Sequence, residues 1–316
     1  MSSGARVLLV VTGNLEQVAL ADALGRLFPS ATFKTTKTNG FTSQKLPLPV
    51  PGYHASKAED LVEELLGAAI SPERGVPPYD FAVAVEDVEL FNEVDVAALG
   101  ASRADEGIEC ILAHMKLAIS TVLHRKNAEQ TTTVLPKGKA KHTSSIATDH
   151  DRQQFLRERC SFHLLRPMAE ALLFGDRAAL DRAAGDRVEL PTVHFDPTTR
   201  DIEAFETDDP AYLATPDGQA RWAKSNRRRH PKHYLEYLLD PGGTAIRPYK
   251  EIEHGKRGLS QLDWEAVLAP STHARMVRAF LEDLADMLGV ALPPWAAGAC
   301  HPATQRRFGG ALRNLR

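Results

Sequence analysis

Three carboxylates stand within four residues, directly after a short apolar run. The run, residues 81–85, reads Phe-Ala-Val-Ala-Val, which is typical of a buried strand in a parallel sheet. Ligands of open α/β sheets gather beyond the carboxyl ends of such strands. Acids placed there repel one another unless a cation or a basic side chain offsets them, and Mg²⁺ prefers oxygen ligands. Glu86, Asp87 and Glu89 are therefore candidates for a metal site, with a solvated acidic turn as the alternative.

A basic run with interleaved aromatic residues lies between positions 221 and 234. Cationic side chains contact phosphates, and aromatic rings stack on unpaired bases. Pro231 at the start of a helix would leave N–H groups that also suit an anion. The alternative is that the arginines pair with the acids of residues 201–209. The residues that we expect to contact a nucleic-acid backbone are Arg227, Arg228, Arg229 and Lys232.

Glu170 is an isolated carboxylate in an apolar segment. Its neighbours are Met168, Ala169 and the run Ala-Leu-Leu-Phe at 171–174. A carboxylate beside so much apolar surface is usually paired. As a functional group it would be a further metal ligand or a general base. As a structural group it would cap a helix or form an ion pair with Arg166 or His163.

The composition is that of an ordinary globular protein, with 316 residues, 43% hydrophobic residues and a net charge of −3. Contact with nucleic acid would therefore need a local basic patch. Three widely separated cysteines argue against a zinc site or a disulfide framework and fit a reducing compartment. No apolar run reaches the length of a spanning helix, and the N-terminus shows no signal peptide. We expect a cytoplasmic protein without membrane contact.

Apolar periodicity predicts parallel α/β architecture in the first half of the chain. The predicted strands are 6–11, a weak strand followed by an extended loop within 33–53, the run that ends at residue 85, and 131–135. The predicted helices are 15–28 with Asn14 as N-cap, 58–70, 107–125, 152–180 with a break at Pro167, and 271–288 with Gly289 as C-cap. We assign residues 1–150 to an α/β domain, 151–290 to an α-rich region packed on it, and 291–316 to a C-terminal tail.

Four segments in the second half of the chain form a recognisable series. The most specific is residues 163–176, in which His163, Pro167 and Glu170 lead into Ala-Leu-Leu-Phe and then an aspartate. The others are the His-Pro-Lys-His-Tyr-Leu stretch at 230–235, the Tyr-Lys and Gly-Leu pairs within 249–259, and the last helix with its Phe-Leu pair. Together they span over a third of the chain and resemble a group of Toprim-like bacterial proteins of unassigned function.

The resemblance implies a Toprim-like sheet that holds Mg²⁺, or Mn²⁺, for phosphoryl transfer. Toprim domains place a glutamate after the first strand and an Asp-x-Asp pair after a later one. Asp87-Val88-Glu89 is similar to that pair and would hold the ion, but Thr12 stands at the glutamate position. Glu16, Glu86 or Glu170 would then have to supply the missing carboxylate.

Two functions remain open from the sequence. The first is Mg²⁺-dependent phosphodiester chemistry on nucleic acid, as a nuclease in anti-phage defence. The second is a non-catalytic adaptor, the partner subunit of an ATPase or of another defence-complex protein. Thr12 favours the adaptor, because a lost carboxylate weakens both cation binding and base catalysis. The genomic context of ATPases and defence genes is an implication of the resemblance alone.

Overall fold

The computed structural model describes residues 4–40, 56–68, 79–88, 104–132, 149–185, 189–244, 249–305 and 309–315. Within this part of the chain, four strands form one parallel sheet in the order β2-β1-β3-β4. The strands are β1 (Arg6–Val11), β2 (Thr32–Lys37), β3 (Phe81–Asp87) and β4 (Cys160–Leu165). The predicted α/β class is therefore confirmed: the parallel sheet is flanked by helices and followed by a helix-rich C-terminal region.

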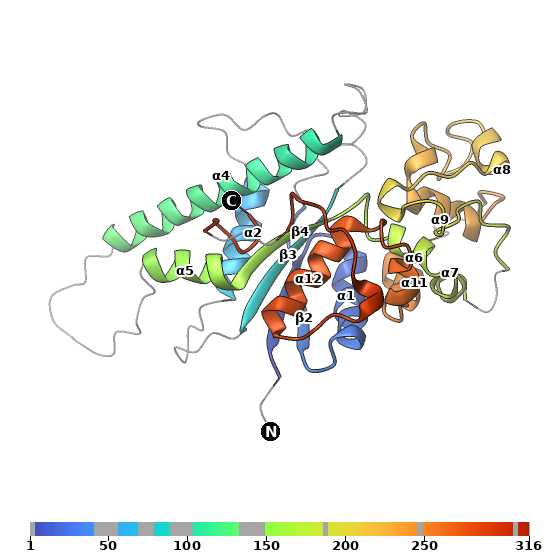
Figure 1. The fold of residues 1–316 in the computed structure, drawn as a ribbon. Helices are drawn as coiled ribbons and strands as arrows, with labels where there is room; N and C mark the ends of the chain where they lie inside the picture. Colours follow the sequence, from blue (N-terminus) through green and yellow to red (C-terminus); the bar gives the residue numbers. More distant parts are fainter. Residues whose placement is uncertain are drawn as a thin grey trace.

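Helices cover both faces of the sheet (Figure 1). On one face lie α1 (Asn14–Leu27) and α12 (Arg275–Leu288), and on the other α2 (Ser56–Gly67), α4 (Ala104–Thr132) and α5 (Asp149–Arg159). Side chains of β1 alternate between the faces, so Val7 and Leu9 join the first core whereas Leu8 and Val10 join the second. None of the described helices is long and apolar enough to cross a membrane.

Short helices of the C-terminal region gather at one end of the sheet (Figure 1). Their buried aromatic side chains join the core that contains α1, and the Trp264 indole N–H donates to the carbonyl of Ala23 in α1 at 2.9 Å. This region contains α6 (Ala171–Gly175), α7 (Arg177–Ala184), η2 (Ile202–Ala204), α8 (Pro210–Ala214), η3 (Arg227–Arg229), α9 (Pro231–Leu239), η4 (Glu251–Gly255), α10 (Lys256–Leu259), α11 (Trp264–Leu268) and η5 (Pro294–Ala296).

Most of the elements predicted from periodicity are confirmed, with ends displaced by a few residues. The structure contains the predicted strand 6–11 and helices at 15–28, 58–70, 107–125 and 271–288. Gly289 is the C-cap of α12 and has the left-handed backbone expected there, with φ of 65°. Asn14 is the first residue of α1 rather than its N-cap, a position that Gly13 occupies.

The prediction of a helix over 152–180 was wrong in its middle. Residues 160–165 form β4, so the sheet extends beyond residue 150 into the segment assigned to the α-rich region. Ser161 and His163 obscure the apolar strand pattern, yet both are buried. His163 is accommodated because its Nε2 lies 3.1 Å from a carboxylate oxygen of Asp283 in α12. The predicted strand 131–135 begins on the last residues of α4, and 133–135 lie outside the described residues.

The chain's last described segment satisfies the outer edge of β4. The Asn314 side chain accepts a hydrogen bond from the Phe162 N–H at 3.0 Å and donates one to the Phe162 carbonyl at 2.6 Å. The Arg313 N–H donates to the carbonyl of Cys160 at 2.9 Å. Because an edge strand otherwise leaves backbone groups unpaired, these contacts complete the sheet where β4 has no neighbouring strand in the described sheet.

We expect Asn314→Ala to destabilise the protein by roughly 2–3 kcal/mol, because it leaves a buried N–H and a buried carbonyl of Phe162 without these partners. Denaturant unfolding measures the change. Asn226→Ala is the matched control, since the Asn226 side chain does not cap the short helix that follows it, and its cost should stay within about 0.5 kcal/mol. Equal stabilities of the two variants would contradict the role of Asn314 in pairing the backbone of β4.

Candidate functional site at the carboxyl edge of the sheet

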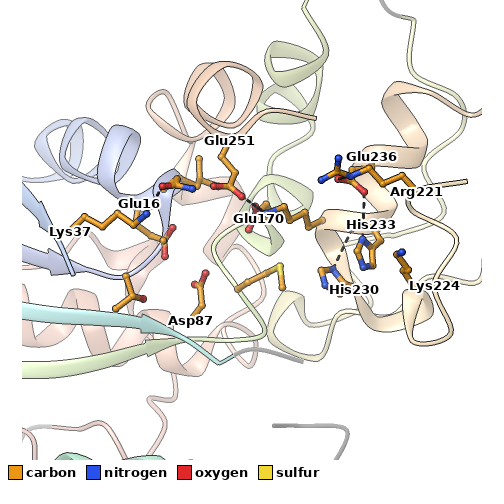
Figure 2. A pocket seen from close by; sticks show the side chains of 16 residues that line it. Glu16, Lys37, Asp87, Glu170, Arg221, Lys224, His230, His233, Glu236 and Glu251 are labelled. Carbon is orange, nitrogen blue, oxygen red and sulfur yellow. Dashed lines mark hydrogen bonds and ion pairs between the residues drawn. The ribbon is translucent and has the colours of Figure 1, made fainter. Parts of the chain in front are cut away.

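A cavity of about 640 Å³ lies at the carboxyl edge of the sheet (Figure 2). Residues that follow β1, end β2 and β3, or follow β4 line it together with residues of α9 and η4. This is the edge where the sequence predicted a site. The lining residues are Thr12, Gly13, Asn14, Leu15, Glu16, Lys37, Asp87, Met168, Glu170, Arg221, Lys224, His230, Lys232, His233, Glu236 and Glu251.

Glu16 is an acid of the cavity whose pKa is strongly raised. It lies in the first turn of α1, is buried, and its Oε1 has no hydrogen-bond partner among the described residues. Burial, followed by the negative charge of Glu170, raises the pKa of Glu16 to about 7, although hydrogen bonds from its own backbone and with Asp87 act in the opposite direction. A carboxyl group in this state exchanges its proton for a cation at little electrostatic cost.

Asp87 and Glu86 diverge because side chains alternate along β3. Asp87 lines the cavity, and its Oδ1 accepts a hydrogen bond from the Ala169 N–H at 3.0 Å, which links the end of β3 to the loop after β4. Glu86 is buried on the other face, where a Cβ added at Gly40 would lie 3.0 Å from its Oε1. Among the described residues, Glu86 is not part of the cavity lining, and Glu89 lies outside the described residues.

Glu170 faces a lysine that the sequence analysis did not name as its partner. The Lys232 Nζ lies 3.9 Å from Glu170 Oε1 and forms a short ion pair with Glu251. Burial opposes the charge of Lys232, but these two carboxylates raise its pKa above the usual value. Burial likewise opposes ionisation of Glu251, and Lys232 lowers its pKa nonetheless. His163, one of the partners expected for Glu170, pairs with Asp283.

The arginines at 227–229 do not line the cavity, whereas Lys232 does. Arg227 is buried; its guanidinium pairs with Asp217 and donates to the Leu213 carbonyl at 2.8 Å. Arg228 and Arg229 are exposed and pair with Glu206, as the ion-pair alternative predicts. The cations of the basic run that face the cavity are Arg221, Lys224 and Lys232.

Three charged residues of the cavity had no role in the sequence prediction: Lys37, Glu236 and Glu251. Glu236 lies on α9. Lys37 ends β2, and its Nζ lies 2.5 Å from Asn14 Oδ1 at the start of α1. Glu251 begins η4 and reaches Lys232. A lysine at a strand end and an acid after the Tyr-Lys pair at 249–250 are weak signals, because neither type nor spacing distinguishes them from surface residues.

The acidic side of the cavity offers oxygen ligands without forming a closed cage. Among the described residues, no group of three or more His, Cys, Asp or Glu side chains is arranged to hold an ion. Mg²⁺ is usually bound by one or two carboxylates together with water and substrate phosphates. Glu16 Oε1, which has no hydrogen-bond partner in the described part of the chain, and the adjacent Asp87 fit that mode of binding.

Comparison with known proteins identifies no relative: no family model, no curated protein and no solved structure matches this chain. The functional argument therefore depends on the residues of the cavity.

The raised pKa of Glu16 predicts how stability depends on pH in the metal-free protein. Because the folded-state pKa of about 7 exceeds the ordinary glutamate value of 4.5, the folded state binds more protons between these values. Stability from this group is thus lost as pH rises from about 4.5 to about 7. We expect Glu16→Gln to raise the free energy of unfolding by roughly 2 kcal/mol at pH 8, and much less at pH 4.

Denaturant unfolding in EDTA at the two pH values measures this difference. Glu265→Gln is the control, because Glu265 is exposed on α11, and it should change stability equally little at both. A gain for Glu16→Gln that is the same at pH 4 and pH 8 would show that its carboxyl group is not perturbed.

Proposed function

We propose that this protein is a Toprim-like, Mg²⁺-dependent enzyme that cleaves phosphodiester bonds of nucleic acid. Glu16 and Asp87 hold the ion, with Mn²⁺ as a substitute, and Glu170 is the general base. Lys232, Lys224 and Arg221 hold the phosphate backbone. Arg227, Arg228 and Arg229 are left out of this set because they pair with acids away from the cavity.

The observation that carries the proposal is the buried Glu16 carboxyl beside Asp87 and Glu170 in a cavity that also presents cations. Three acids that gather against repulsion, one of them with a pKa near 7, are characteristic of functional sites. Figure 2 shows Glu16 and Asp87 toward one end of the cavity and Arg221 and Lys224 toward the other. A phosphate between them would meet cations on one side and a metal-binding pair of acids on the other.

The residues of the cavity then have different roles in hydrolysis. Glu16 and Asp87 would hold the Mg²⁺ ion, which when bound would stabilise charge at the phosphate and lower the pKa of a water molecule. Lys232 neutralises phosphate charge while keeping Glu170 and Glu251 in place. Glu170 accepts the proton of the attacking water. Glu16 takes the place that the resemblance assigns to the first-strand glutamate, four residues after Thr12, because α1 turns its first-turn side chain toward the sheet edge.

Cleavage of single-stranded and duplex DNA and of RNA, with Mg²⁺, Mn²⁺ or EDTA, tests this function. We expect metal-dependent cleavage of at least one substrate and a loss of about 10²-fold or more in Glu16→Gln and in Asp87→Asn, since each removes charge that holds the ion. Asp181→Asn and Glu265→Gln are matched controls, because both carboxylates are exposed, and they should retain full activity.

Wild-type levels of cleavage in folded Glu16→Gln and Asp87→Asn would place any activity elsewhere. If the wild-type protein cleaves none of the substrates with either metal, the enzyme proposal fails and the non-catalytic adaptor for an ATPase or defence complex takes its place.

Gly13 gives a test of metal binding that does not remove a carboxylate. A Cβ at Gly13 would lie 2.2 Å from Glu16 Oε2, so Gly13→Ala must displace that carboxyl group, although its φ of −92° suits alanine. We expect at least about 10-fold weaker Mn²⁺ binding by titration calorimetry, with the fold retained.

Gly25→Ala in the same helix is the control, because no atom lies within 4 Å of its added Cβ. It should leave Mn²⁺ affinity unchanged and stabilise α1 by about 0.5–1 kcal/mol. Unchanged Mn²⁺ affinity in Gly13→Ala would exclude Glu16 as a ligand.

A further inference from the structure

Helix α9 presents a histidine and a glutamate to the cavity at a spacing of three residues. His233 and Glu236 both line it and are neighbours on the helix surface. The ring of His233 stacks on that of His230, with centroids 3.7 Å apart and planes 24° apart. Figure 2 shows these side chains across the cavity from Asp87 and Glu16.

Both members of this pair contain a buried polar atom for which the described ranges of the chain supply no hydrogen bond. His233 Nδ1 and Glu236 Oε2 each have no hydrogen-bond partner among the described residues, yet they lie 3.6 Å apart. A small rotation of either side chain would complete the bond, and catalytic hydrogen bonds are often long before substrate binds. The other carboxylate oxygen, Oε1, lies 3.7 Å from Arg221 Nε, which limits how far Glu236 can turn away.

His230 has a different state from His233. Its Nδ1 accepts the backbone N–H of His233 at 3.4 Å, at the N-cap of α9. Burial, together with the neighbouring His233 and Lys232, lowers the pKa of His230 to about 3. His230 is therefore a neutral group that supports the helix start, and of the two imidazoles His233 is the one beside a carboxylate.

We propose that His233 is the general acid that protonates the leaving oxygen, and that Glu236 is the positioning residue that orients its ring through Nδ1. This assignment rests on the proposed phosphodiester cleavage. Water attacks phosphorus and gives its proton to Glu170, while the bond from phosphorus to the leaving oxygen breaks. The leaving oxygen keeps the electron pair and takes the proton from His233 Nε2, and solvent returns a proton to the ring.

Substrates with different leaving groups test the assignment. A nucleic-acid strand leaves as an alkoxide, which needs a proton, whereas bis(p-nitrophenyl) phosphate leaves as a stabilised phenolate, which does not. We expect His233→Gln to lose roughly 10²–10⁴-fold in kcat on an oligonucleotide and less than about 10-fold on the phenyl ester. Glu236→Gln should show the same selectivity with a smaller loss. His150→Gln, at an exposed position of α5, is the matched control and should leave both rates unchanged.

An equal loss on the two substrates would overturn the assignment, because a merely structural role damages both reactions alike. Full oligonucleotide cleavage by His233→Gln would overturn it as well. Failure of the cleavage function itself gives a different result, in which wild-type protein and control variant hydrolyse neither substrate with Mg²⁺ or Mn²⁺, and both proposals fall.

Discussion

Repulsion between carboxylates is the constraint that organises the cavity. Parallel strands end at one edge of the sheet, and that edge brings Glu16, Asp87 and Glu170 together with Glu251 from η4. Four acids in one cavity cannot all be ionised unless cations offset their charges; otherwise some of them keep their protons. Lys232 offsets two of them, whereas Glu16 has a pKa of about 7 and so keeps its proton through mildly acidic pH. The fold thus retains an electrostatically unfavourable carboxyl group at a position where a neutral side chain would make the folded protein more stable.

The cations that face these acids are held in position by the packing of the helix-rich region, which lies far along the chain. Buried aromatic rings hold the helix-rich region together, and the Tyr234 hydroxyl both donates to Asp209 and accepts the N–H of His194. Arg227 holds the loop before α9 through backbone carbonyls such as that of Leu213. Within one basic run, the buried arginine therefore shapes the region, and Lys232, five residues later, supplies charge to the cavity.

The outer edge of β4 shows how polar groups support the strands that carry the site. Asp283 of α12 lies between His163 of β4 and Arg313 of the chain's last segment, with contacts of 3.1 and 3.2 Å. Burial opposes the ionisation of Asp283, yet the hydrogen bond and charge of His163 lower its pKa. Together with Asn314, these contacts fix β4, whose following loop carries Glu170 and donates a hydrogen bond to Asp87.

The sequence by itself determined the local structure: apolar periodicity located β1, β3, α1 and α12, and the strand-end rule located the acidic edge at Asp87. It missed β4, because tertiary contacts satisfy the buried Ser161 and His163, which local pattern cannot show. Only the tertiary structure decided which charges meet. Alternation along β3 separates Glu86 from Asp87, the turn of α1 brings in Glu16, and packing brings Lys232 and Glu251 to Glu170. The physical reason is the distance along the chain over which each effect acts. Backbone periodicity sets the direction of a side chain within one element, whereas burial of the shared core brings distant segments together.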